Sequence, residues 1–250
     1  MTETPHHDVT GSGPVLLIVP GGAGHPMGLE PLTERLARRF TVVTYDPLGL
    51  AHGRLGLPVA DQRPADWSDG AHRLLEAVLP PGERAYVFGT SSGGIAVLDL
   101  LARHPRRLAG VVAHEPPCVT VLPDGAERRA ELLGQFAGAG RPPAEGESAT
   151  PMGVFLAHVL QPFTAYAPSA PSVLSAPSAL SAPPAGPRVT LGAGADSRGQ
   201  LLYRTAEFLA DRLDGSFAEF PGGHLGTLDH PGDFAGLLTE TFLSGAHTSA

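Results

Sequence analysis

The sequence predicts an α/β protein, with a mostly parallel sheet and helices on both faces of that sheet. Short apolar runs without polar alternation recur along the chain, which is typical of strands covered on both faces. Segments with helical spacing of apolar residues follow most of these runs, and Gly- and Pro-rich stretches separate the two. The 250 residues are enough for one sizeable core.

The predicted elements alternate up to residue 113. We expect strands at 15–19, 41–45, 85–88 and 109–113, and helices at 29–39, 67–79 and 95–103. A Pro- and Gly-rich loop is expected between residues 46 and 66. The alternation resumes with strands at 189–191 and 216–220, helices at 200–213 and 231–242, and a frayed tail after residue 244.

About 70 residues lie between the strands at 109–113 and 189–191. Helices are expected at 127–136 and 154–160, with a loop at 141–150. Residues 169–184 repeat Ser-Ala-Pro-Ser-x-Leu, which is either a low-complexity linker or short helical turns opened by serine and proline. An insertion of this size is typical of a lid. We therefore expect a core of residues 1–115 and 188–250 and a helical cap of residues 116–187.

The charge and the cysteine count exclude several classes of protein. A net charge of -8 without any basic run argues against nucleic acid or an anionic membrane as partner. The single cysteine, Cys118, cannot form an intramolecular disulfide, and the apolar run at 15–19 is too short to span a bilayer. We expect a cytoplasmic protein without cofactor or metal, and a homodimer is one assembly that the sequence allows.

The pentapeptide at residues 89–93 has the pattern Gly-x-Ser-x-Gly and lies between a predicted strand and a predicted helix. In that context a sharp turn lifts the hydroxyl of Ser91 clear of the sheet edge. The same turn points the backbone N–H of Ser92 at the group that is attacked. Only small residues fit two positions before and after the serine, because the backbone is crowded there. The pattern therefore indicates a nucleophilic serine.

A nucleophilic serine needs a base, and His224 is the histidine best placed to act as one. It ends the last predicted strand in the Gly-rich loop at 221–224. Two carboxylates at strand ends are candidates to orient this base. Glu115 runs out of a strand into two prolines, whereas Asp196 follows the strand after the insertion and keeps the chain order serine, acid, histidine. Position alone does not separate them.

The developing oxyanion needs two N–H donors, and Ser92 supplies one of them. The Gly-rich loop at 20–24 is expected to supply the other, from Gly22. This loop lacks the known phosphate-binding patterns, and the chain has no lysine. Because ligands bind beyond the carboxyl ends of parallel strands, we expect all these groups to share one site.

These segments resemble the α/β-hydrolase superfamily at residues 20–22, 46–53, 89–93 and 221–224. The resemblance implies an α/β-hydrolase fold with a cap inserted late in the sheet. Two features depart from it: the usual N-terminal antiparallel strand pair has almost no room before Val15, and the oxyanion loop has proline where histidine is usual.

More narrowly, the chain resembles the zearalenone-lactonase branch in its Val-Pro oxyanion loop, its Ser-Ser-Gly elbow and its His-Glu-Pro-Pro segment at 114–117. In that branch the glutamate is the catalytic acid, so the resemblance favours Glu115 over Asp196. The cap does not match, so zearalenone itself is not implied.

Together these features predict a cofactor-independent serine hydrolase that cleaves an ester or lactone through an acyl-enzyme. The predicted triad is Ser91, Glu115 and His224, with Asp196 as the alternative acid. Aromatic residues of the cap fit an apolar or aromatic small-molecule substrate, although core packing explains them equally well. The alternative is a non-hydrolytic enzyme of the same fold, a thioesterase, cyclase or lyase of a biosynthetic pathway.

Overall fold

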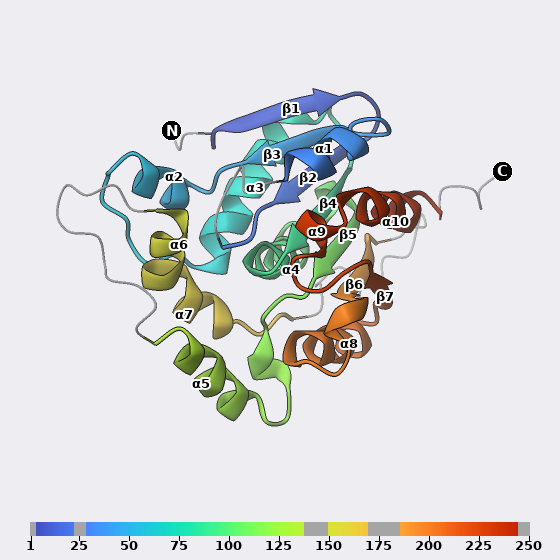
Figure 1. Cartoon of the computed structure of the whole chain (residues 1–250). Helices are drawn as coiled ribbons and strands as arrows, with labels where there is room; N and C mark the ends of the chain where they lie inside the picture. The colour runs from blue at the N-terminus through green and yellow to red at the C-terminus, as the bar shows by residue number, and fades with distance from the viewer. Residues whose placement is uncertain (1–3, 23–28, 138–149, 170–185, 245–250) are drawn as a thin grey trace, which may run out of the picture.

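The computed structural model describes residues 4–22, 29–137, 150–169 and 186–244. Within these residues, seven strands form one sheet in the order β1-β3-β2-β4-β5-β6-β7 (Figure 1). Every pair of neighbouring strands is parallel except β1 and β3. This confirms the predicted mostly parallel sheet. The strands are β1 His7–Gly11, β2 Val15–Val19, β3 Thr41–Tyr45, β4 Ala85–Thr90, β5 Leu108–His114, β6 Arg188–Gly194 and β7 Ser216–Phe220.

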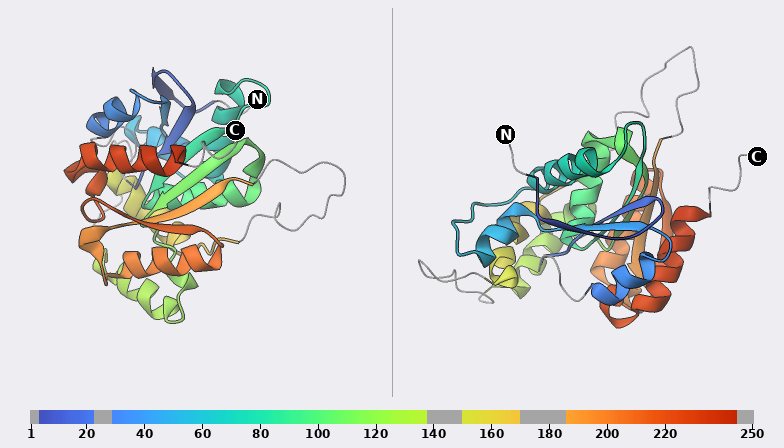
Figure 2. Two further views of the ribbon diagram at one scale, coloured as in Figure 1. Left: turned by 90° about the vertical axis from the view of Figure 1, so that its right-hand side faces the viewer. Right: turned by 90° about the horizontal axis from the view of Figure 1, so that it is seen from above.

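Helices cover both faces of this sheet (Figure 2). They are α1 Glu30–Leu36, α2 Leu48–Arg54, α3 Pro64–Val78, α4 Ser92–Arg103, α5 Gly125–Gln135, α6 Pro151–Val154, α7 Leu160–Thr164, α8 Leu201–Arg212, α9 Gly226–Asp229 and α10 Pro231–Leu243. Side chains alternate along each strand, so Leu17 and Val19 pack with α3, α4 and α8 on one face. Leu16 and Ile18 pack with α1 and α10 on the other. The continuous apolar run of β2 therefore contributes side chains to two hydrophobic clusters, one on each face of the sheet.

One strand lies before β2, where the sequence left almost no room. β1 pairs antiparallel with β3 at the edge of the sheet, so only one of its sides is hydrogen-bonded to the sheet. Most of its side chains are exposed. An exposed edge strand needs no apolar residues, which is why its sequence carries no strand signal.

The loop expected at 46–66 contains a helix, α2, and the first turn of α3. Two glycines lower the intrinsic helix propensity of α2, and they explain why it was not expected. One of them, Gly49, is buried against Gln62, where an added Cβ would lie 2.3 Å from the side chain. Close packing therefore outweighs local propensity in this segment.

The segment between β5 and β6 contains α5 and a second helical stretch at residues 151–164. The second stretch consists of α6, a π-helical turn at Phe155–Val159, and α7. Both predicted helices of the insertion are thus present, and the second is longer than expected. The repeat from residue 170, the loop at 141–149 and the tail from residue 245 lie outside the described residues.

Candidate active site

The turn between β4 and α4 presents Ser91. Its backbone has φ 54° and ψ −123°, a conformation that non-glycine residues rarely adopt. An added Cβ on Gly89 would lie 2.3 Å from the carbonyl oxygen of Gly93, and one on Gly93 would lie 2.2 Å from that of Val19. The two glycines of the pentapeptide are therefore required by contact with backbone. The strain at Ser91 costs about 1–3 kcal/mol, and this crowded packing maintains it.

Glu115 is buried directly after β5, and its carboxylate contacts His224. Its Oε2 lies 2.8 Å from Nδ1 of His224, and its Oε1 accepts the N–H of Gly194 at 2.9 Å. The backbone at Glu115 has φ 43°, which turns the side chain out of the strand direction. Its own N–H donates to the carbonyl of Gly192 at 2.8 Å, which fixes the turn against β6.

Glu115 is held as a carboxylate. Burial by itself would raise its pKa, because a charged group is poorly solvated there. Hydrogen bonds from His224, the Gly194 N–H and the Ser197 hydroxyl outweigh burial and lower the pKa of Glu115 to about 2. An ionised acid beside Nδ1 holds the histidine proton on that nitrogen and leaves Nε2 free to act as a base.

Asp196 lies in the turn after β6 and is exposed to solvent. Its backbone N–H donates to the carbonyl of Gly222 at 2.9 Å, so the residue is near the loop that carries His224. Among the described residues, however, no hydrogen bond or ion pair joins its carboxylate to His224. Of the two acids left open by the sequence, Glu115 is the one that contacts the histidine.

The end of β5 also supports the serine. The carbonyl of His114 accepts the backbone N–H of Ser91 at 2.9 Å, and the next residue is Glu115. Two consecutive residues therefore hold the backbone of Ser91 and the ring of His224. Within the described residues, no hydrogen bond joins the hydroxyl of Ser91 to His224.

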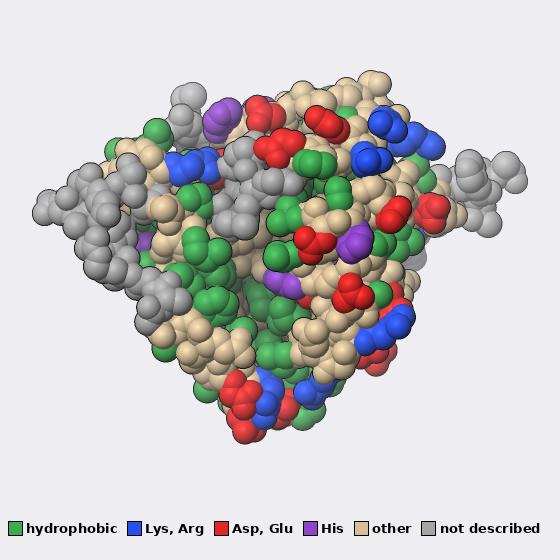
Figure 3. All heavy atoms as spheres, viewed as in Figure 1, with side chains coloured by type: hydrophobic (Ala, Val, Ile, Leu, Met, Phe, Trp, Pro, Cys, Tyr) green, Lys and Arg blue, Asp and Glu red, His purple; other side chains and the backbone are tan. Residues whose placement is uncertain are grey.

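The loop after β2 lies beside the serine. An added Cβ on Gly21 would lie 3.6 Å from Cβ of Ser91, and Gly22 is the last described residue before the gap at 23–28. Ser92 is buried at the start of α4. The two segments expected to supply oxyanion donors therefore meet at Ser91. Figure 3, viewed from the same side as Figure 1, shows a hollow in the middle of the molecule's face, with hydrophobic side chains on its floor and a histidine at its edge.

Two residues that donate hydrogen bonds to the carboxylate of Glu115 were not among the predicted site residues. Gly194 and Ser197 donate to its carboxylate from the end of β6 and the turn beyond it. A Cβ on Gly194 would lie 2.4 Å from the carbonyl oxygen of Gly222, so this glycine lets the two loops meet. The Gly-Ala-Gly sequence at 192–194 is the signal that could have indicated such a close approach.

Asp99 is a second buried carboxylate that the sequence analysis did not single out. It lies on α4 and accepts hydrogen bonds from Ser68 on α3 and from Arg103, the latter at 3.2 Å. Burial raises the pKa of Tyr166, and a hydrogen bond to Asp99 raises it further. The network therefore joins α3 and α4 to the segment after α7. An aspartate within the otherwise apolar stretch 95–102 of α4 is the signal for it.

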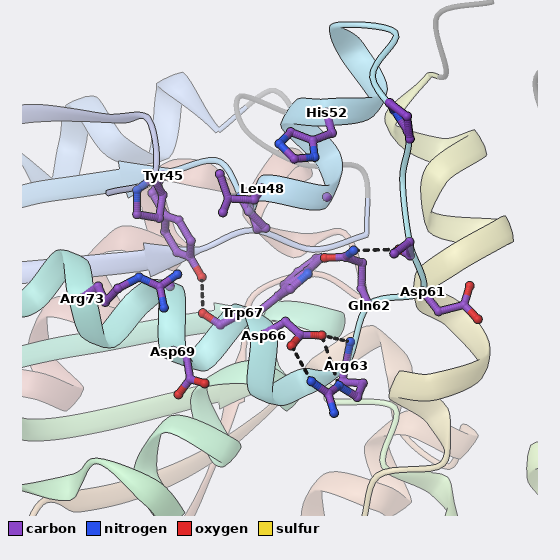
Figure 4. A pocket seen from close by; sticks show the side chains of 16 residues that line it. Tyr45, Leu48, His52, Asp61, Gln62, Arg63, Asp66, Trp67, Asp69 and Arg73 are labelled. Atoms are coloured by element: carbon purple, nitrogen blue, oxygen red, sulfur yellow. Dashed lines mark hydrogen bonds and ion pairs between the residues drawn. The ribbon is translucent and has the colours of Figure 1, made fainter. Parts of the chain in front are cut away.

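A separate cavity of about 700 Å³ lies between α2, the loop that follows it and α3 (Figure 4). Trp67 forms part of its wall, and Asp66 at its edge pairs with Arg63 at 3.0 Å. None of the candidate catalytic residues lines it. In the described part of the chain, no cluster of His, Cys, Asp or Glu has the arrangement needed to hold a metal ion. No helix there is long and apolar enough to cross a membrane.

Comparison with known proteins gives matches over most of the chain. A family model described as "Alpha/beta hydrolase family" matches residues 16–237. The uncharacterised hydrolase YraK of Bacillus subtilis is 30% identical over 248 residues, covering 94% of this chain and 91% of that protein.

Solved structures match the fold. A thermophilic esterase from Thermogutta terrifontis has a TM-score of 0.67 and 17% identity, covering 97% of this chain and 94% of that one. The carboxylesterase CesB from Bacillus subtilis has a TM-score of 0.58 and 17% identity, covering 98% of this chain and 90% of that one.

Proposed function

This chain belongs to the alpha/beta hydrolase family and is a hydrolase, and from that premise we propose that it is a serine hydrolase that cleaves an ester or a lactone. The hydrogen bond between buried Glu115 and His224, beside the strained Ser91, is the observation that carries the proposal. The esterase and carboxylesterase among the structurally similar proteins support an ester bond as the target.

In the proposed reaction, Nε2 of His224 takes the proton of the Ser91 hydroxyl as its oxygen attacks the substrate carbonyl. The N–H groups of Ser92 and Gly22 stabilise the oxyanion that forms. The imidazolium then gives its proton to the leaving alcohol. A water molecule, activated by the same histidine, releases the acid and restores the serine. Glu115 stays ionised throughout and stabilises the imidazolium, which its low pKa allows.

We propose that residues 116–187 act as a cap over this site and that the substrate is a small apolar or aromatic molecule. Lactones stay in the substrate class because residues 114–117 resemble the corresponding segment of the zearalenone-lactonase branch. A cytoplasmic location and a homodimer stay predictions, which cell fractionation and light scattering would test.

A fluorophosphonate probe tests the proposal. We expect one adduct on the intact protein, located on Ser91, and loss of ester hydrolysis on the order of 10⁶-fold in Ser91→Ala. Labelling without turnover of any lactone, aryl ester or thioester would favour the non-hydrolytic alternative. Absence of both labelling and turnover would refute the assignment of Ser91 as nucleophile.

A further inference from the structure

The ring of Phe155 covers the loop that follows β2. Phe155 is the first residue of the π-helical turn Phe155–Val159, and its side chain is partly buried against the core. A Cβ added to Gly22 would lie 2.4 Å from Cδ2 and 2.7 Å from Cγ of this ring. The ring therefore contacts the backbone of Gly22 and fills the space that a side chain at position 22 would need.

The π-helical turn holds Phe155 in this position. The carbonyl of His158 accepts the backbone N–H of Gln62 at 2.8 Å, and Nδ1 of His158 lies 3.0 Å from Oδ1 of Asp61. Val154, just before the turn, and Val159, its last residue, are almost fully buried. The turn is therefore attached to the loop before α3 and to the core. π-helical turns are rare and are frequently found at functional sites.

Phe155 lies close to the proposed nucleophile. A Cβ on Gly21 would lie 3.6 Å from Cβ of Ser91, and the ring of Phe155 lies on the next residue, Gly22. In the proposed acyl-enzyme, the carbonyl oxygen faces the N–H of Gly22, so the ring that lies on Gly22 borders the space around the acyl group. A fixed aromatic ring there limits how far the acyl chain can extend.

We propose that Phe155 sets the size limit of the acyl group, so that the enzyme prefers esters and lactones with short acyl chains. This inference rests on the proposed function. It makes Phe155 a specificity-determining residue of the same site, and it makes Gly22 its partner: the loop must have glycine at this position because the ring lies on it.

A stability measurement tests the contact without any use of activity. Gly22→Ala is expected to lower Tm in the wild-type background, because the new methyl group displaces the ring. In the Phe155→Ala background, the same change is expected to lower Tm much less, because the space is open. Phe136→Ala, at the end of α5 and partly exposed, is the matched control and is expected to leave the effect of Gly22→Ala unchanged. Equal effects in all three backgrounds would overturn the proposal.

A kinetic measurement tests the specificity. We expect kcat/KM of the wild-type protein for p-nitrophenyl esters to fall from acetate to decanoate. Phe155→Ala should raise kcat/KM for octanoate about tenfold and change that for acetate little, while Phe136→Ala keeps the wild-type profile. An unchanged chain-length profile in Phe155→Ala, or a change that follows the alcohol instead of the acyl group, would refute the size limit.

The two proposals fail in different ways. If no ester is hydrolysed but Ser91 reacts, labelling rates of short- and long-chain alkyl fluorophosphonates replace kcat/KM. The long-chain rate should then rise selectively in Phe155→Ala, and equal ratios would overturn the size limit. If Ser91 does not react at all, the proposed function is overturned, and the acyl-group role of Phe155 with it.

Discussion

Glu115 and His224 define the site at the scale of single residues. The carboxylate is buried and ionised, and it receives three hydrogen bonds, from the ring of His224, the Gly194 N–H and Ser197. Such a group can hold one tautomer of the imidazole and stabilise its protonated form. Exposed Asp196 makes no such contact in the described structure. The two carboxylates therefore differ in what their replacement should do.

We expect Glu115→Gln to lower kcat on the order of 10⁴-fold, because an amide favours the wrong histidine tautomer while keeping the shape. Asp196→Asn is the matched control and is expected to change kcat only a few-fold. Steady-state kinetics on one aryl ester, with circular dichroism to check folding, compares the two. The assignment of the acid fails if the aspartate variant shows the larger loss.

At the scale of elements, backbone contacts between glycines position the turn that carries Ser91. The start of α4 lies against the end of β2 so closely that a side chain at Gly93 would overlap the carbonyl oxygen of Val19. The same kind of contact brings Gly194 at the end of β6 against the loop at Gly222. Strand ends that meet backbone to backbone leave no room for adjustment, and this makes the site rigid.

Gly93→Ala is therefore expected to destabilise the fold by about 1–3 kcal/mol, the usual cost of overpacking. Gly134→Ala is the matched control, because an added Cβ on this exposed glycine of α5 meets no atom within 4 Å. It should stabilise the protein by about 0.5–1 kcal/mol through helix propensity. Urea unfolding measures both. Equal stability of the two variants would contradict the packing argument.

At the scale of the whole molecule, the core on the α1 and α10 face encloses a histidine. The ring of His114 packs edge-to-face against Phe220 and Phe234, which stack on each other; its centroid distances to them are 5.8 and 5.2 Å, and it is fully buried. Burial lowers the pKa of His114 from 6.5 to about 4, the charge of Glu115 raises it, and that of His224 lowers it. The folded protein thus contains a buried imidazole that stays neutral near pH 7.

This histidine should make the whole fold sensitive to acid. Between pH 6.5 and pH 4 the unfolded chain binds a proton at His114 that the folded chain does not. The free energy of unfolding should therefore fall as the pH drops through this window, by an amount on the order of 3 kcal/mol. His114→Leu should remove most of this dependence, whereas exposed His6→Ala should keep it. Urea unfolding at several pH values measures this dependence. If the free energy of unfolding of His114→Leu falls with pH as steeply as that of the wild type, another group is responsible.

Most of the architecture could be predicted from the sequence. Uniformly apolar runs such as 15–19 indicate strands of a parallel sheet, because a strand buried on both faces cannot alternate with polar residues. Two of the elements that were missed, β1 and α2, lack this signal for physical reasons. β1 is an exposed edge strand, and α2 contains two glycines, one of which, Gly49, packs closely against Gln62.

The sequence by itself determined the α/β class, the parallel sheet and the turn at Ser91, because each follows from local periodicity and from the small residues of one pentapeptide. It also brought Ser91, His224 and two carboxylates to one edge of the sheet. Only the tertiary structure decided which carboxylate contacts His224. That choice depends on the positive φ of Glu115 and on the contact of Gly194 with Gly222. Both are set by how neighbouring strands pack. The glycines at 192–194 indicate a close approach there, but the order of residues along the chain does not say which carboxylate that approach supports.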